Sequence, residues 1–158
     1  MVHALGKASS LLKPDGVLID IHPTLELATL EVRIGGDTHR AGVVTEADGG
    51  EEYKDADAAL AFTVRQGLLR IEREATFTFV THADSLATLR EHLADAWQDA
   101  VIDDVSARAI ETLMTATAAD KELLLRERVR MTRFRVLPTR DSSLVTRDSC
   151  EPPAWPAP

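Results

Sequence analysis

An α+β or open α/β fold is predicted by three features of the sequence. Segments that alternate polar and apolar residues, as strands do, are interspersed with segments whose apolar residues recur at helical spacing. The chain has 158 residues, the length of one domain, and 44% of them are hydrophobic, which is enough for a buried core. We therefore expect a mixed, partly antiparallel sheet of four to six strands, with three to four helices packed on it.

The charge balance and the composition exclude several classes of protein. Twenty-six acidic and 18 basic residues give a net charge of −8, so we expect no nucleic-acid partner and no binding to anionic membranes. No apolar run approaches the roughly 20 residues that span a bilayer, and the first residues show no signal-peptide pattern. The single cysteine, Cys150, rules out an internal disulfide and favours a cytoplasmic location.

A helix and a strand joined by a tight turn are predicted first. Apolar residues at helical spacing predict a helix over 2–12. The turn at 13–16 combines Pro, which presets one dihedral angle, with Gly, which adopts positive φ values. The nearly continuous apolar run 17–21 predicts a strand buried on both faces, which ends at Pro23.

A β-hairpin and an acidic loop are predicted next. Apolar and charged residues alternate over 30–34, the Gly-Gly-Asp sequence at 35–37 is a strong turn signal, and 40–46 returns as the second strand. The segment 46–55 contains two glycines and several acids, so we expect an exposed loop.

The middle of the chain is predicted to hold a helix and a long strand. Asp55 or Asp57 is expected to cap a helix that reaches Gln66 and stops at Gly67. A strand follows over 69–82. Its alternation places one set of residues on one face: Ile71, Arg73, Ala75, Phe77 and Phe79. The other face carries the remaining set: Glu72, Glu74, Thr76, Thr78 and Val80.

Two amphipathic helices are predicted after this strand. Asp84 is the expected N-cap of the first, whose apolar residues recur at helical spacing: Leu86, Leu89, Leu93 and Trp97. We expect this helix to pack on the sheet face that carries Phe77 and Phe79. The second helix begins at Asp103 or Asp104, and its expected apolar face consists of four residues: Val105, Ala109, Leu113 and Ala116.

The last predicted strand, over 126–137, carries five arginines that alternate with apolar residues. After Thr132 the alternation shifts by one residue, which predicts a β-bulge. The arginines form either a basic stripe for phosphate or nucleic acid, or a solvated strand face opposite Glu72 and Glu74. We favour the solvated face, because opposite charges pair across neighbouring strands.

Residues 1–137 are predicted to form the single domain, and residues 138–158 a mobile tail. Five of the seven prolines fall in this tail, where they block helices and central strands. Trp155 lies among these prolines and is a candidate to dock on a partner or on the domain. The alternative is a tail without function.

The sequence assigns no catalytic, metal-ligating or cofactor-binding residue. No two of the five histidines have the spacing of metal ligands: His3, His22, His39, His82 and His92. Ser9 and Ser10 lack a nucleophile motif. The acids after the hairpin are expected to be solvated: Glu46, Glu51, Glu52, Asp55 and Asp57. A small enzyme with its own pocket is a weaker alternative, because three histidines lie near predicted strand ends: His22, His39 and His82.

One segment resembles class I S-adenosylmethionine-dependent methyltransferases. It comprises His3-Ala4-Leu5 and residues 11–20, with the sequence LLKPDGVLID. In that family a helix ends in a Leu-Lys-Pro-Gly-Gly turn that leads into the fifth strand of a seven-stranded sheet; here Asp15 replaces the first Gly. The resemblance implies that a helix and two antiparallel strands follow, which 70–82 and 126–137 would supply. The family's Gly-rich cofactor turn and ribose-binding acid have no counterpart, so no cofactor is expected.

The resemblance implies a module derived from the C-terminal half of a methyltransferase. We expect it to be non-catalytic by itself and to act as an interaction or small-ligand-binding domain. The alternative is the C-terminal part of an active methyltransferase that a separate cofactor-binding chain completes, so whether the chain is an enzyme stays open. A homodimer is also expected, because the strand 17–21 would expose one edge. Either the hairpin at 30–45 or a second copy would cover that edge.

Overall fold

A computed structural model describes residues 2–13, 15–117 and 120–137, and it has an α+β fold, as predicted. Ten elements follow one another: α1 (Val2–Leu11), β1 (Val17–Pro23), β2 (Ala28–Ile34), β3 (Asp37–Glu46), α2 (Glu51–Arg65), β4 (Leu69–Ala83), α3 (Leu86–Ala96), β5 (Ala100–Ile102), α4 (Asp104–Met114) and β6 (Lys121–Val136). The strands form an open six-stranded sheet whose described pairings are all antiparallel. Within these ranges no helix is long and apolar enough to cross a membrane. The predicted tail, with Cys150 and Trp155, lies outside them.

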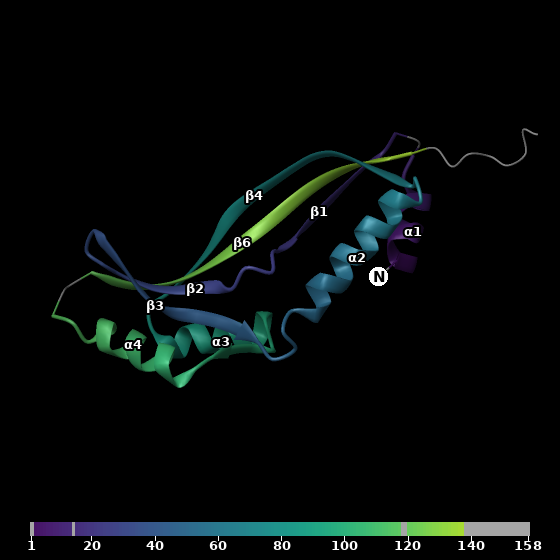
Figure 1. The fold of residues 1–158 in the computed structure, drawn as a ribbon. Helices are drawn as coiled ribbons and strands as arrows, with labels where there is room; N and C mark the ends of the chain where they lie inside the picture. Colours follow the sequence, from purple (N-terminus) through teal and green to yellow (C-terminus); the bar gives the residue numbers. More distant parts are fainter. Residues whose placement is uncertain (1, 14, 118–119, 138–158) are drawn as a thin grey trace, which may run out of the picture.

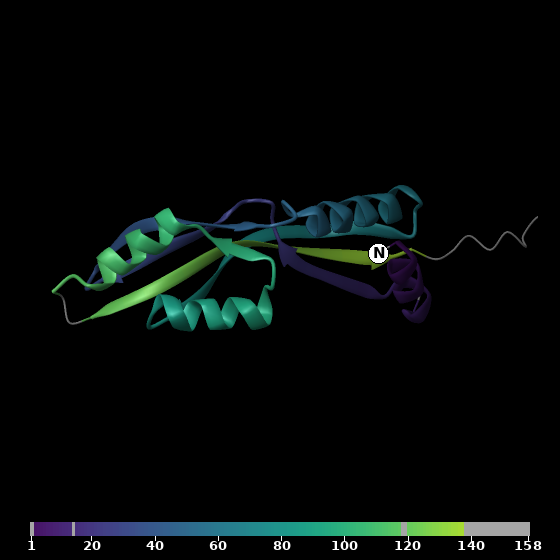
Figure 2. The ribbon, with the colours of Figure 1, turned by 90° about the horizontal axis from the view of Figure 1, so that it is seen from below.

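The last strand, β6, organises the sheet. β4 pairs along one edge of β6, whereas β1 and β2 share the other edge. β3 and the short β5 extend the sheet beyond β2. In Figure 1, β4 and β6 run the length of the molecule, with α1 and α2 near one end and α3 and α4 near the other. Figure 2 shows the same division from below.

Two hydrophobic cores lie on opposite faces of β6. Near its start, Leu123 and Leu125 belong to the core that α3 and α4 cover. Near its end, Phe134 and Val136 pack with Leu60 of α2. Successive side chains of a strand point to opposite faces, so the odd-numbered residues of β6 face one core and the even-numbered residues face the other. The long strands twist between the two ends, so both helix pairs appear below the sheet in Figure 1.

These two cores explain the shift in alternation along β6, and the bulge expected near Thr132 lies on the neighbouring strand β4. β6 pairs with β4 and β1 without an extra residue of its own; the irregularity lies on β4, between Ile71 and Arg73. The buried residues of β6 change from odd to even positions, because α3 and α4 cover one face near its start and α2 covers the other face near its end. Because of the irregularity on β4, Ile71 pairs with Phe134 and lies on the face that α2 covers. The sequence had placed Ile71 on the same face as Arg73, Ala75, Phe77 and Phe79, so this assignment is wrong for Ile71.

The predicted hairpin and the start of α4 are confirmed. β2 and β3 pair across a turn at Gly35 and Gly36. The Asp103 side chain caps α4, since its Oδ1 accepts a hydrogen bond from the Ser106 backbone N–H at 2.7 Å. This hydrogen bond lowers the pKa of the Asp103 carboxyl. The cap of α3, however, is Ser85 and not Asp84.

The acidic segment before residue 57 is mostly helix, not loop. α2 begins at Glu51, directly after Gly50, and no side chain caps it, so the predicted caps at Asp55 and Asp57 are wrong. After Gly50 nothing in the segment breaks a helix, and acidic residues in a first turn interact favourably with the helix dipole. The predicted end at Gly67 is confirmed, with a φ of 70°.

Two helix faces differ from the prediction. Leu86, Leu89 and Leu93 are buried, but they pack in the core of the β2–β3 half, whereas Phe77 and Phe79 are exposed. Trp97 caps the C-terminus of α3 and is partly buried. α4 buries a neighbouring stripe, consisting of Ser106, Ala107 and Ile110, and leaves Val105 68% exposed.

The strand β1 is not buried on both faces. It pairs only with β6 among the strands of the sheet, which makes it an edge strand. Its even-numbered residues face α2, while Ile19 and Ile21 are more than half exposed on the opposite face. An apolar run therefore predicted the strand correctly but not its burial, because burial depends on what the rest of the chain places over it.

Candidate functional site

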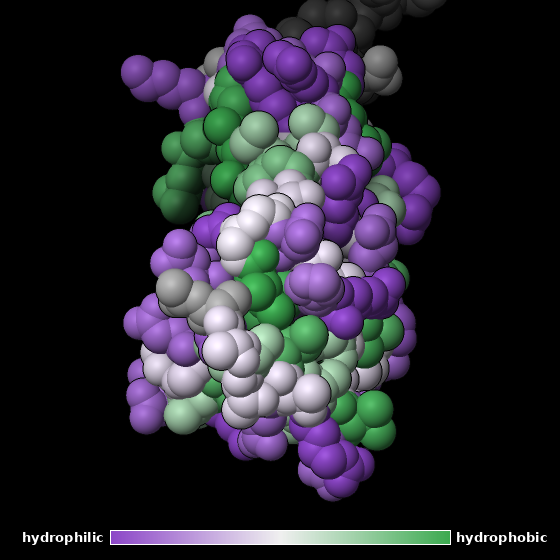
Figure 3. All heavy atoms as spheres, turned by 90° about the vertical axis from the view of Figure 1, so that its left-hand side faces the viewer, coloured by the Kyte–Doolittle hydropathy of each residue, from purple (hydrophilic) through white to green (hydrophobic). Residues whose placement is uncertain are grey.

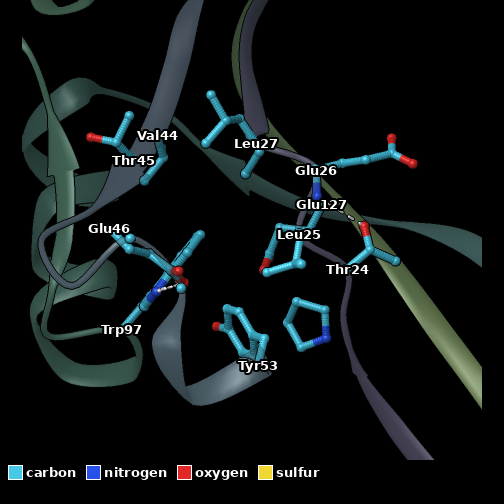
Figure 4. Close-up of a pocket in the computed structure, with 14 residues that line it drawn as sticks. Thr24, Leu25, Glu26, Leu27, Val44, Thr45, Glu46, Tyr53, Trp97 and Glu127 are labelled. Atoms are coloured by element: carbon cyan, nitrogen blue, oxygen red, sulfur yellow. Dashed lines mark hydrogen bonds between the residues drawn. The ribbon is translucent and has the colours of Figure 1, made fainter. Parts of the chain in front are cut away.

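A cavity of about 300 Å³ lies where the chain passes from β1 to β2. β1 pairs with β6 as far as Val129, and β2 begins to pair at Arg126, so residues 127–128 of β6 face a gap between the two strands. A single backbone hydrogen bond bridges it, from the Thr24 N–H to the Arg128 carbonyl at 2.7 Å. The end of β3, the start of α2 and Trp97 enclose the cavity (Figure 4).

The cavity combines apolar walls with aromatic rings and carboxylates. Aliphatic side chains form much of the wall: Pro23, Leu25, Leu27, Ala28 and Val44. The rings belong to Tyr53 and Trp97, and the carboxylates to Glu26, Glu46 and Glu127. None of the residues that line the cavity is a lysine, an arginine or a histidine. The site is therefore both apolar and negatively charged.

Glu46 is held at the cavity wall by Trp97. The Trp97 indole Nε1 donates to Glu46 Oε1 at 2.9 Å, as Figure 4 shows, and Tyr53 lies beside Glu46 in the wall of the same cavity. Burial, followed by this contact with Glu46, raises the pKa of Tyr53 well above its usual range, so the hydroxyl stays a donor. Gly50 leaves room for the carboxylate: a Cβ there would lie 2.9 Å from Glu46 Oε2.

Glu127 is half-buried in the same cavity. Burial raises the pKa of the Glu127 carboxyl, and the charge of Glu46 adds to this effect, whereas His92 opposes it. Within the described ranges, neither Glu46 nor Glu127 forms an ion pair. The cavity thus holds carboxylates that no protein cation neutralises by direct contact.

Glu46 also belongs to a small carboxylate group with Asp48 and Asp99, whose oxygen atoms lie within 4.8 Å of one another. Glu46 and Asp48 are neighbours in the chain, but Asp99 comes from a distant segment, so residue spacing could not reveal the group. Asp48 is exposed, and exposed acids gather at many protein surfaces without a metal. We therefore assign no metal to this group.

The histidines singled out in the sequence are not brought together. His22 is partly buried under α2, where its Nδ1 lies 2.7 Å from Asp20 Oδ2 and its Nε2 lies 3.1 Å from Asp57 Oδ1. His39 is exposed on β3, and His82 is exposed on β4. The side chains of His3 and Ser9 lie outside what the structure describes, and Ser10 donates to a backbone carbonyl of its own helix.

Around His22 the ionic groups largely satisfy one another. Arg130 pairs with Asp57 and lies 2.9 Å from His22 Nε2. A second cavity, of about 450 Å³, adjoins this network below α2. The hydroxyl that lines it, on Thr132, hydrogen-bonds to Glu74. The network therefore links β1, α2 and β6, which is a structural role.

The arginines at the end of β6 form a solvated strand face, as expected. Arg133 and Arg135 both donate to Glu72, at 3.0 and 2.7 Å. These contacts, led by the hydrogen bond from Arg135, lower the pKa of the Glu72 carboxyl. The arginines are thus paired with an acid of the neighbouring strand.

Comparisons with known proteins identify no relative. No family model matches the chain, and neither does any curated protein or solved structure. The geometry of the site therefore carries the functional argument.

Sequence reasoning missed the residues that form the cavity. It treated Glu46 as a solvated acid, and it gave no role to Tyr53 or Glu127. The available signal was weak: Tyr53 is the only tyrosine, and it lies within a segment that was expected to be a loop.

Proposed function

We propose that this chain is a small-ligand-binding module and that its ligand is an organic cation with an apolar body. The cavity between β1 and β2 carries this proposal, because it joins carboxylates and aromatic rings to aliphatic walls and contains no basic residue. Carboxylates and the faces of aromatic rings both attract an ammonium group. At about 300 Å³, the cavity lies at the small end of the range of roughly 300–1,000 Å³ for ligand pockets.

Glu46 and Glu127 have different roles in this proposal. Glu46 is preorganised, since Trp97 holds its carboxylate in place before a ligand arrives. Glu127 is the adjustable group, because burial favours its protonated form. A bound cation favours the ionised form, so binding should release protons as Glu127 ionises and weaken as the pH falls.

The antiparallel pairing of β4 with β6 supports descent from a methyltransferase-like protein, as the resemblance implies. The β2–β3 hairpin between β1 and the helix α2 is a departure from the order that the resemblance implies. β6 also pairs antiparallel with β1. We propose that the chain does not transfer methyl groups by itself, because it has no counterpart of the family's Gly-rich turn or ribose-binding acid.

Calorimetric titration with three ligands of matched shape tests the proposed ligand class. Benzylammonium is a cation, benzyl alcohol is neutral and benzoate is an anion at neutral pH. We expect only benzylammonium to bind and to shift the NMR signal of the Trp97 indole N–H. A Trp155→Phe background makes that signal the only one of its kind.

Variants locate the binding site. Glu46→Gln should weaken benzylammonium binding at least tenfold, whereas Glu91→Gln, which removes an exposed carboxylate on α3, should leave it unchanged. Equal binding of benzyl alcohol would show that charge plays no part and would refute the proposal. Tight binding of Ca²⁺ that Asp48→Asn abolishes, without benzylammonium binding, would indicate a metal site instead.

A further inference from the structure

We propose that the uncovered face of β1, β6 and β4 is a two-fold interface between two copies of this chain. We call this surface the open face and define it by six residues: Ile19, Ile21, Ala75, Phe77, Phe79 and Met131. It lies opposite α2, and it adjoins the ligand cavity at Glu127.

The strand register places these side chains on one surface. Ile21 pairs with Met131, and Met131 pairs with Ala75 on the other side of β6. Directly paired residues of antiparallel strands point to the same face. The same holds for the next row, where Val129 lies between Pro23 and Phe77.

The open face exposes a large area of apolar side chains to solvent. Each of its five large side chains is at least 40% exposed: Ile19, Ile21, Phe77, Phe79 and Met131. With roughly 200 Å² per side chain, about half exposed, they present on the order of 500 Å², near the upper limit for a monomer. At the end that carries the β2–β3 turn, hydrophobic and hydrophilic residues are mixed over the surface (Figure 3).

The two ends of the open face carry opposite charge. At one end Arg70, Arg133 and Arg135 surround the single acid Glu72, which leaves an excess of positive charge. At the other end Glu127, which pairs with Phe79 across the strands, lines the acidic cavity together with Glu26 and Glu46. The strand positions 127 and 133 of β6 are about 20 Å apart.

This gradient makes the open face complementary to itself. A two-fold axis that lies between the two sheets, parallel to them and perpendicular to the strands, brings the basic end of each copy over the acidic end of its partner. The chain as a whole has a net charge of −8, so most other contacts between two copies would be repulsive. A standard interface buries about 800 Å² per partner, which the apolar centre and its charged ends together would supply.

The hairpin does not cover this region. β2 pairs with β6 and with β3, and among the strands described neither β2 nor β3 pairs with the outer edge of β1. Of the two ways to cover β1 that the sequence suggested, the second copy therefore remains. The exposed apolar residues reach as far as Phe79 on β4, two strands from β1, which favours packing of the faces over pairing of β1 edges.

Sedimentation velocity of the full chain at high micromolar concentration tests this interface. We expect twice the chain mass of 17.3 kDa. Phe79→Lys and Ile21→Lys should each give the monomer mass, because a charge on the open face is buried in the dimer. Val105→Lys, at an exposed apolar residue of α4, should remain dimeric. Circular dichroism of each variant establishes that it is folded.

Two results would overturn the interface. One is a wild-type chain that sediments at 17.3 kDa. The other is a dimer that Ile21→Lys dissociates and Phe79→Lys does not, since this would place the contact at the β1 edge. The interface and the ligand site can be tested independently. Glu46→Gln should weaken benzylammonium binding at least tenfold without changing the mass, and Phe79→Lys should change the mass without abolishing binding.

Discussion

Replacing Gly42 with alanine should destabilise the protein by about 1–3 kcal/mol, the usual range for overpacking. Gly42 lies in β3 where the first turn of α4 crosses the sheet. A Cβ at this position would lie 2.0 Å from Ser106 Oγ and 2.5 Å from Ser106 Cβ. Contacts between carbon atoms are most favourable at about 3.5–4.0 Å. Ser106 is buried, and its Cβ cannot rotate away, so α4 must shift relative to the sheet.

A compensating substitution separates this clash from other effects of alanine. Ser106→Gly removes both clashing atoms and leaves the Ser106 Cα 3.2 Å from the added Cβ, a contact that a small shift relieves. By itself Ser106→Gly should cost about 0.5–1 kcal/mol, because glycine disfavours helix. In the double variant, Gly42→Ala should therefore cost clearly less than it does in the wild-type background.

Urea unfolding of the four proteins in this cycle measures the coupling. Gly36→Ala is the matched control, since a Cβ at Gly36 meets no atom within 4 Å. Strictly additive free energies, or a Gly42→Ala variant as stable as wild type, would refute the close approach of α4 to β3.

Two further predictions concern the cavity and the cofactor. Because folding raises the pKa of Glu127, the folded state holds this proton more tightly than the unfolded state does. The free energy of unfolding therefore falls as the pH rises through the pKa of Glu127 in the folded state. Glu127→Gln should therefore be more stable than wild type at neutral pH, and the difference in urea unfolding should vanish below about pH 4; a persistent difference there would contradict the assignment. Calorimetric titration of the chain with S-adenosylmethionine should show no micromolar binding, and such binding would revive the methyltransferase alternative.

Local patterns were sufficient for most elements of the fold. The hairpin around Gly35, the long strand before Ala83 and the helix that Asp103 caps depend on neighbours a few residues apart, and each appears where the pattern predicted it. The α+β class follows from the order of such segments. Start positions were less predictable: α2 begins before its expected caps, because an uncapped acidic segment can extend a helix.

The faces and the cavity were decided by the tertiary structure. The alternation in β6 shifts because two different helix layers cover opposite faces of one strand, which no pattern within the strand can distinguish from a bulge. Ile19 and Ile21 are apolar yet exposed, because no element covers their side of β1. Glu46, Trp97 and Glu127 come from three elements far apart in the chain and meet only where β1 and β2 separate along β6. A sequence pattern records how a residue relates to its neighbours along the chain, whereas burial and charge in a cavity depend on contacts between distant segments.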